Sequence, residues 1–258
     1  MHHIIQILLF SILLSSCSKE SMTTESIAND PVPQPADSTP LNNGTVYYTG
    51  NIDSLPKFVR ISYMEFDSIG RISKFRSGWG HDYSDDFEFC RSMKHYFEPK
   101  NFSIPNVDIK IYSPFKGVVE RVIQEWAGTQ LYIASTEYPA FSARLFHVSL
   151  NHPINIGDTL YEGEYIGTHI GNITSSDIAI TVLTAVDGPK DSTISQSGIR
   201  YVSYFSVLTD SLLHQFEMRG LNLDSIIIPA TTRDVYPLDC INQAFTDPGV
   251  FSNWILIQ

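Results

Sequence analysis

Apolar and polar residues alternate in short runs through the middle of the chain, a pattern that is typical of β-strands with one buried face. The run Phe58–Phe66 is followed by turn residues at Asp67–Gly70 and by a second run at Arg71–Phe75, which predicts an antiparallel hairpin. Further strands are expected at Val107–Tyr112, Gly117–Ile123, Gln130–Ala134, Ser142–Val148, Tyr165–Ile170 and Asp177–Thr184. Gly or Pro separates most of these runs, so the pattern predicts a mainly β fold with an antiparallel sheet, barrel or sandwich.

The last part of the chain follows a different pattern. Within Tyr201–Arg219 the apolar residues recur at close to helical spacing, and Gly220 follows as a stop signal. These apolar residues are Phe205, Leu208, Leu212, Leu213 and Phe216. We therefore expect one amphipathic helix that faces the core. The segment Thr231–Trp254 is irregular, and we expect it to wrap over the β-domain.

The first residues have the pattern of an export signal. The apolar run Ile4–Leu14 is too short to span a bilayer and fits the central region of a signal peptide. It ends in Leu-Ser-Ser-Cys at residues 14–17, which resembles a bacterial lipobox. This resemblance implies cleavage before Cys17 and lipidation of the new terminal cysteine. The protein would then be anchored to a membrane of the bacterial cell envelope, on the periplasmic or outer face; a plain secretory signal is the alternative.

Composition divides the chain into four parts. A segment rich in Ser, Thr, Pro, Asn and Asp follows Cys17 and has too few large apolar residues to fold by itself, which predicts a disordered tether. The expected organisation is a signal peptide at 1–16, the tether at 17–45, a β-domain at 46–185 and a helix-containing C-terminal extension at 186–258.

Charge and cysteine content narrow the class of protein. The net charge of −11 over 258 residues argues against nucleic acid as a partner, and against an anionic bilayer bound through a basic patch. In an oxidising compartment, Cys90 and Cys240 are expected to form a disulfide that pins the C-terminal segment beside His81. Cys90 as a metal ligand or catalytic thiol is the alternative.

The stretch Gly80–Asp85 is the first candidate for chemistry. His81 and Asp85 form an H-x-x-x-D pair, and an imidazole and a carboxylate at this spacing can hold zinc. An extended chain would separate them by roughly 13 Å, whereas both ligand atoms must lie about 2 Å from one metal. The segment must therefore curl if it binds metal. Otherwise it is a polar loop with a surface histidine.

Several pieces of the chain occur in the order of a known family. The strand Tyr112–Val119, the strand Leu145–Leu150 with His147, and the Gly-Asp hairpin Ile156–Gly167 follow the H-x-x-x-D pair. Together they resemble the lysostaphin-like, LytM-type zinc metallopeptidases, which have the duplicated hybrid motif fold. The resemblance covers about Gly78 to Leu183, and it implies that fold, a zinc cofactor and the hydrolysis of peptide bonds in peptidoglycan.

The resemblance also implies roles for individual residues. His81 and Asp85 match zinc ligands, and His147 matches a histidine that assists the attacking water. The third element departs from the family, because the chain has Asp177 and Ala179 where an H-x-H strand is expected. Residues i and i+2 of a strand share a face, so Asp177 should point into the same cleft as Ala179. We therefore expect Asp177 to act as a replacement zinc ligand or general base, with His147 as the second catalytic residue.

Two further histidines are possible metal donors. His169 lies near the end of the Gly-Asp hairpin and is expected at the surface. His95 lies in Arg91–Phe97, where we expect a short helix or turn, and is interpreted as a packed or solvated side chain.

The sequence thus leaves three functions open. The first is a cell-envelope lipoprotein whose modified LytM-like cleft binds peptidoglycan or regulates wall hydrolases. The second is an active zinc metalloendopeptidase that uses Asp177 in place of a histidine ligand. The third is a structural or ligand-binding lipoprotein of another kind.

Overall fold

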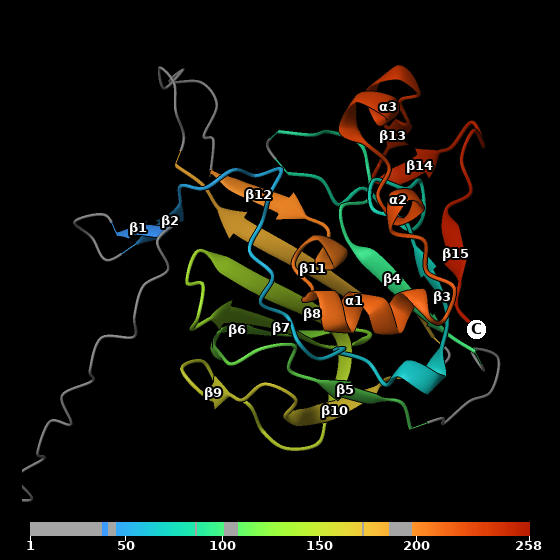
Figure 1. Ribbon diagram of the computed structural model, residues 1–258. Coiled ribbons are helices and arrows are strands. Elements are labelled where there is room, and N and C mark those ends of the chain that lie inside the picture. The colour runs from blue at the N-terminus through green and yellow to red at the C-terminus, as the bar shows by residue number, and fades with distance from the viewer. Residues whose placement is uncertain (1–37, 41–44, 86, 101–107, 172, 186–197) are drawn as a thin grey trace, which may run out of the picture. The chain divides into compact units, whose positions relative to one another are not determined.

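The computed structural model describes residues 38–40, 45–85, 87–100, 108–171, 173–185 and 198–258 (Figure 1). These residues all belong to one unit, Val32–Gln258. The predicted signal peptide, Cys17 and most of the predicted tether lie outside the described residues. The tether segment does include a described strand, β1 (Ser38–Pro40), which pairs with β2 (Val46–Tyr48). No helix in the described part of the chain is long and apolar enough to cross a membrane.

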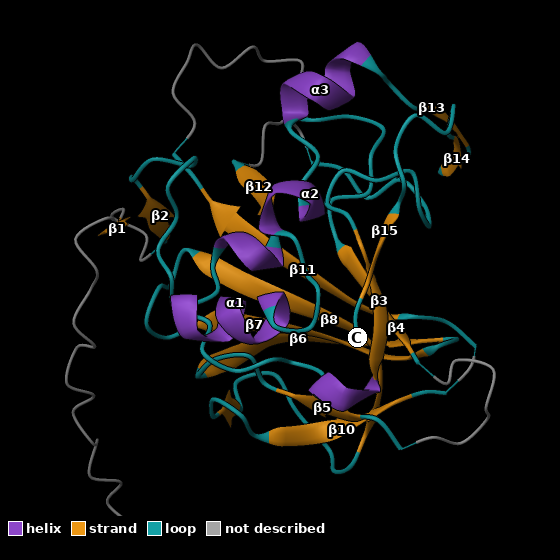
Figure 2. Ribbon diagram, turned by 45° about the vertical axis from the view of Figure 1, so that its right-hand side comes forward, coloured by secondary structure: helices purple, strands orange, loops and turns teal. Residues whose placement is uncertain are grey.

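One large antiparallel sheet dominates the fold, as the sequence predicted (Figures 1 and 2). Its main path runs β15 (Trp254–Leu256), β3 (Ile69–Ser73), β4 (His95–Pro99), β11 (Ser176–Leu183), β8 (Phe141–Leu150), β7 (Gly128–Ser135), β6 (Gly117–Glu125), β9 (Thr159–Leu160). Off this path, β10 (Tyr165–His169) pairs with β8 and with β5 (Lys110–Tyr112), and β12 (Ile199–Val202) pairs with β11. A separate hairpin joins β13 (Asp239–Ile241) to β14 (Ala244–Thr246).

The predicted hairpin at residues 58–75 is wrong. Neighbouring residues of its first segment are buried together, namely Phe58 with Val59 and Tyr63 with Met64. A strand with one buried face cannot bury consecutive side chains on that face, so this segment runs through the core with only isolated bridges. It ends in a 3-10 turn, η1 (Phe66–Ser68), and β3 pairs instead with β4 and β15.

The C-terminal helix is shorter than predicted. Helix α1 covers only Asp210–Glu217, because the preceding residues form β12 and the 3-10 turn η2 (Tyr204–Ser206). Its apolar face does point to the core, since Leu212 and Phe216 are buried. Two short helices follow, α2 (Leu223–Ile226) and α3 (Ala230–Val235).

The extension and the β-domain share one core. Phe216 of α1 packs against Phe205 at a ring distance of 5.1 Å, and Phe205 stacks on Phe97 of β4 at 6.3 Å. The extension also supplies two strands of the large sheet, β12 and β15. Residues after 198 therefore complete the sheet instead of forming a separate layer.

The predicted disulfide between Cys90 and Cys240 is present. It joins the segment after His81 to β13, and the backbone N–H of Asp82 donates to the carbonyl of Gln243 at 2.7 Å in the turn between β13 and β14. The C-terminal hairpin consequently lies beside the His81 segment.

Replacing both cysteines with serine should lower the free energy of unfolding by about 2–5 kcal/mol, because the bridge closes a loop of 150 residues in the unfolded chain. Urea unfolding of the oxidised protein and of the double variant measures this. Limited proteolysis after reduction should cut first near the β13–β14 hairpin. Equal resistance before and after reduction would contradict the role assigned to the bridge.

Candidate functional site

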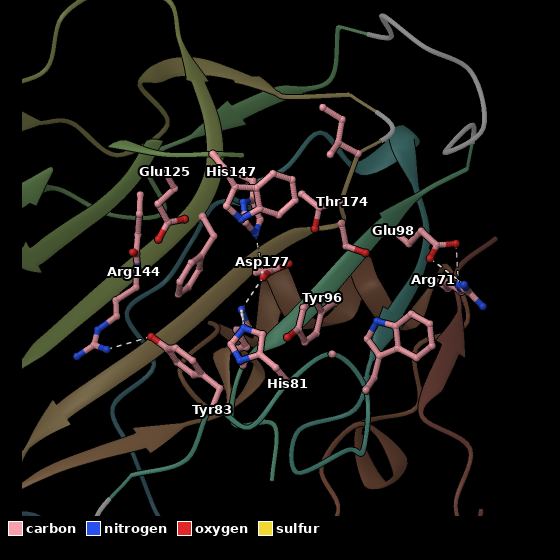
Figure 3. A pocket seen from close by; sticks show the side chains of 18 of the residues that line it. Arg71, His81, Tyr83, Tyr96, Glu98, Glu125, Arg144, His147, Thr174 and Asp177 are labelled. Atoms are coloured by element: carbon pink, nitrogen blue, oxygen red, sulfur yellow. Dashed lines mark hydrogen bonds and ion pairs between the residues drawn. The ribbon is translucent and has the colours of Figure 1, made fainter. Parts of the chain in front are cut away.

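A cleft of about 1240 Å³ opens over the centre of the large sheet, at strands β4, β11 and β8 (Figure 3). The register of these strands defines its floor. Asp177 of β11 lies opposite Tyr96 of β4 on one side and opposite Phe146 of β8 on the other. Cross-strand neighbours share a face, and all three side chains line the cleft.

A β-bulge turns His147 into the same cleft. Thr129 of β7 pairs with Val148, but Leu131 pairs with Leu145, so β8 contains one extra residue. His147 has a φ of 62°, which a non-glycine residue adopts only at a local cost. In a regular strand, Phe146 and His147 would face opposite sides of the sheet. The bulge lets both line the cleft.

The structure brings together three of the four predicted site residues, His81, His147 and Asp177 (Figure 3). It does so around the side chain of Lys94. The ammonium Nζ of Lys94 lies 2.7 Å from Oδ2 of Asp177 and 3.4 Å from Nε2 of His81. Nε2 of His147 lies 3.5 Å from the same Asp177 oxygen. Lys94 precedes β4 by one residue and faces the same way as Tyr96, two positions further on.

Aromatic rings enclose the lysine ammonium. Nζ lies 4.3 Å from the ring centre of Phe146, 4.7 Å from that of Tyr96 and 4.9 Å from that of Tyr83. Ring faces attract a cation at these distances. The charged group of Lys94 is therefore held both by one carboxylate and by three rings.

The charged groups of Lys94, Asp177 and His147 stabilise one another. Burial disfavours the ionised forms of Lys94 and Asp177, but their mutual attraction outweighs it, raising the pKa of Lys94 and lowering the pKa of Asp177. Burial likewise opposes the imidazolium of His147, yet the Asp177 carboxylate raises the pKa of His147. Desolvation and the nearby Lys94 ammonium lower the pKa of His81. A neutral His81 can accept a hydrogen bond from Lys94 through Nε2 while Nδ1–H donates to the Asp82 carbonyl.

Asp85 lies outside this centre. One carboxylate oxygen accepts hydrogen bonds from the backbone N–H groups of Phe87 and Glu88, and the other accepts one from Tyr201 at 2.7 Å. The H-x-x-x-D segment does curl, but the Asp85 carboxylate closes a turn and binds that turn to β12. The predicted set of His81, Asp85 and Asp177 is thus not assembled around one point.

The residues that are present do not fit a zinc ion. Zinc requires ligand atoms at about 2.0–2.2 Å, and the Lys94 ammonium already occupies the space between His81 and Asp177. A second positive charge beside it would be repelled. Ala179 supplies no donor atom, and no group of three His, Cys, Asp or Glu side chains suited to a metal occurs among the described residues.

The two remaining candidate histidines, His169 and His95, are buried and do not line the cleft. His169 is only 3% exposed and donates from Nε2 to the carbonyl of Thr174, so its predicted surface position is wrong. His95 starts β4 where a helix or turn was expected, and its ring bridges the carbonyl of Ser73 and the hydroxyl of Ser203. Burial lowers the pKa of His95 to about 4. Both histidines are packing residues.

Exposed aromatic side chains border the cleft. Trp126, at the turn between β6 and β7, is 81% exposed, and Trp79 is 38% exposed. Trp79 packs on Trp254 of the extension at a ring distance of 4.9 Å, and the guanidinium of Arg71 lies 4.2 Å from the Trp254 ring. The cleft therefore combines an ionic floor with aromatic borders, and the sequence motifs predict no role for Trp126 or Trp79.

Comparison with known proteins yields distant structural matches only. No protein-family model matches the chain, and no curated protein matches it in sequence. Among solved structures, the M23 metalloprotease pseudoalterin, described as from the deep sea, has a TM-score of 0.34 at 13% identity, over 80% of this chain and 92% of the other. A zinc-containing peptidase from Vibrio cholerae has 0.30 at 12% identity, over 55% and 42%. CbpA from L. salivarius REN has 0.23 at 15% identity, over 28% and 46%. The chain thus spans less than half the length of the last two.

Replacing Lys94 with Met should lower the free energy of unfolding by about 3–5 kcal/mol, because the buried charge of Asp177 loses the ammonium that balances it. Asp177→Asn should destabilise similarly, and the double variant should recover part of the loss. Urea unfolding measures the coupling. Lys116→Met is the matched control, since Lys116 also lies near one aromatic ring, that of Tyr161, but is exposed. Independent, additive losses would contradict the pairing.

His147 should stabilise the fold more at low pH than at high pH. Its pKa is higher in the folded than in the unfolded protein, so its contribution is complete below about pH 6.5 and is lost as the pH rises through the folded value. The difference in unfolding free energy between wild type and His147→Gln should therefore shrink from pH 6 to pH 9. A difference that grows over this range would mean that the imidazolium is not stabilised by Asp177.

Proposed function

We propose that the protein is a lipoprotein of the bacterial cell envelope that binds peptidoglycan strands in a LytM-like cleft without cleaving them. The observation that carries this proposal is the Lys94 ammonium, bound to Asp177 and His81 where the family resemblance implies zinc. The anchor at Cys17 rests on the lipobox-like sequence.

The same observation argues against the endopeptidase hypothesis. Hydrolysis in the resembled family depends on a metal that activates water, and this site does not fit the metal. Asp177 is also poorly suited to activate water as a general base, because its lowered pKa makes the carboxylate a weak proton acceptor. Its Oδ2 is also already shared by Lys94 and His147.

The shape of the cleft favours binding of an extended ligand. Its volume of about 1240 Å³ exceeds that of a typical small-molecule pocket, roughly 300–1,000 Å³. Trp126 and Trp79 offer exposed ring faces at its border, and such faces stack on sugar rings and peptide groups. A glycan strand with attached peptides presents both kinds of surface.

Protein purified without chelator should contain no stoichiometric zinc, should bind isolated sacculi and should release no soluble fragments from them. Trp126→Ala should weaken binding about five- to twentyfold through loss of a stacking surface. Tyr161→Ala is the matched control, because Tyr161 is exposed but does not line the cleft. Metal analysis, pelleting with sacculi and dye release provide the measurements.

Other outcomes separate the alternatives. Stoichiometric zinc that is lost in His81→Ala, together with hydrolysis, would establish the endopeptidase instead. Neither zinc nor affinity for the wall would favour a structural or ligand-binding lipoprotein. Binding to a purified wall hydrolase but not to sacculi would favour a regulator.

A further inference from the structure

Arg144 of β8 is a cation in the cleft that has no acidic partner among the described residues. The other two cationic side chains of the cleft are paired, Lys94 with Asp177 and Arg71 with Glu98. Nη1 of Arg144 instead donates to the hydroxyls of Tyr83, at 3.0 Å, and Tyr201. Its Nε is buried without a hydrogen-bond partner.

Three tyrosines hold this guanidinium in place. Its central carbon lies 4.7 Å from the ring centre of Tyr132 and 5.1 Å from that of Tyr201. The hydroxyls of Tyr83 and Tyr201 both accept from Arg144 and are also hydrogen-bonded to each other, so they fix the guanidinium between them. Burial raises the pKa of Tyr83, so its hydroxyl stays protonated. Arg144 and Tyr83 line the cleft, so its wall presents a guanidinium that a tyrosine hydroxyl holds in place (Figure 3).

The residue opposite Arg144 gives it room. Arg144 pairs across the sheet with Ala179, the position at which the family resemblance expects a zinc-binding histidine. Alanine has no side chain beyond Cβ, so the change that removes a metal ligand also removes bulk beside Arg144. Tyr83 then links Arg144 to the Lys94 centre, since it contacts both.

The balance of charge favours an anion at this place. The charge of Lys94 is neutralised by Asp177, so Arg144 remains uncompensated in a protein whose net charge is −11. Glu125 also lines the cleft, but it forms no ion pair with Arg144. An arginine fork binds a carboxylate through two parallel hydrogen bonds.

We propose that Arg144, held in place by Tyr83 and Tyr201, forms a carboxylate-binding subsite, so that the cleft selects peptide chains with a free carboxylate. This inference rests on the proposed function, because the subsite lies in the same cleft. It specifies which part of a wall strand is recognised, namely an acidic group of the peptide and not the glycan.

Calorimetric binding of two probes to the full chain tests the inference. The probes are the stem peptide L-alanyl-γ-D-glutamyl-L-lysyl-D-alanine with free carboxylates and the same peptide with both carboxylates converted to carboxamides. Wild type should bind the acid about ten- to a hundredfold more tightly, as expected for hydrogen bonds to a charged group. Arg144→Gln should abolish this difference.

Matched variants separate recognition from folding. Arg121→Gln should keep the full preference, because Arg121 also stacks on Tyr132, at 5.1 Å, but does not line the cleft. Tyr201→Phe removes one hydroxyl and should reduce the preference several-fold. If thermal unfolding shows that Arg144→Gln is not folded, Arg144→Lys and Tyr201→Phe replace it in the binding test. An unchanged preference for the acid in both variants would overturn the inference.

The failure of the subsite is distinguishable from failure of the proposed function. Equal affinity for acid and amide, with sacculi still bound, would overturn the subsite alone. If neither the stem peptide nor sacculi bind, the proposed function fails. The subsite is then tested with a second pair of probes, N-acetyl-tryptophyl-glutamate and its diamide. Arg144-dependent preference for this acid would support the subsite independently, and no preference would overturn it.

Discussion

The buried ion pair between Lys94 and Asp177 is the constraint on which the site depends. Two charges removed from water are tolerated only when each is closely matched, and here Asp177 shares one oxygen between Lys94 and His147. This contact fixes the register of β4, β11 and β8, because a shift by one residue would move Asp177 to the other face of the sheet. The aromatic rings around Lys94 follow from the same register.

Irregular features then shape the cleft around this pair. The bulge in β8 adds His147 to a face that Phe146 already occupies. The curled segment after His81 is fastened by Asp85 to the backbone of β12 and by a disulfide to the C-terminal hairpin. Residues from the extension therefore support the walls without lining the cleft, since Tyr201 bonds to Arg144 and Trp254 packs on Trp79. As a result, the charge of Lys94 in the floor is paired with Asp177, whereas the charge of Arg144 in the wall has no acidic partner among the described residues.

Much of the sheet could be predicted, because strands β6, β7, β8, β10 and β11 show their period and their turn residues in the sequence. The course of the segment Phe58–Phe66 could not be predicted, because its consecutive residues are buried by other parts of the chain that pack on both of its sides. His81, His147 and Asp177 were found from the order of motifs. Asp85 has a suitable spacing, but three backbone donors use its carboxylate. Lys94 carried no signal of its own, since a lone lysine beside a strand is ordinarily solvated.

The sequence by itself determined the antiparallel β class, the pairing of Cys90 with Cys240 and the absence of a side-chain donor atom at Ala179. These depend on local period, on the count of cysteines and on residue identity. Only the tertiary structure decided that the Lys94 ammonium fills the centre and that Arg144 has no acidic partner. Such pairings join residues that are far apart in the chain, 83 positions in the case of Lys94 and Asp177. Their geometry is set by strand register and burial, which no local pattern of residues contains.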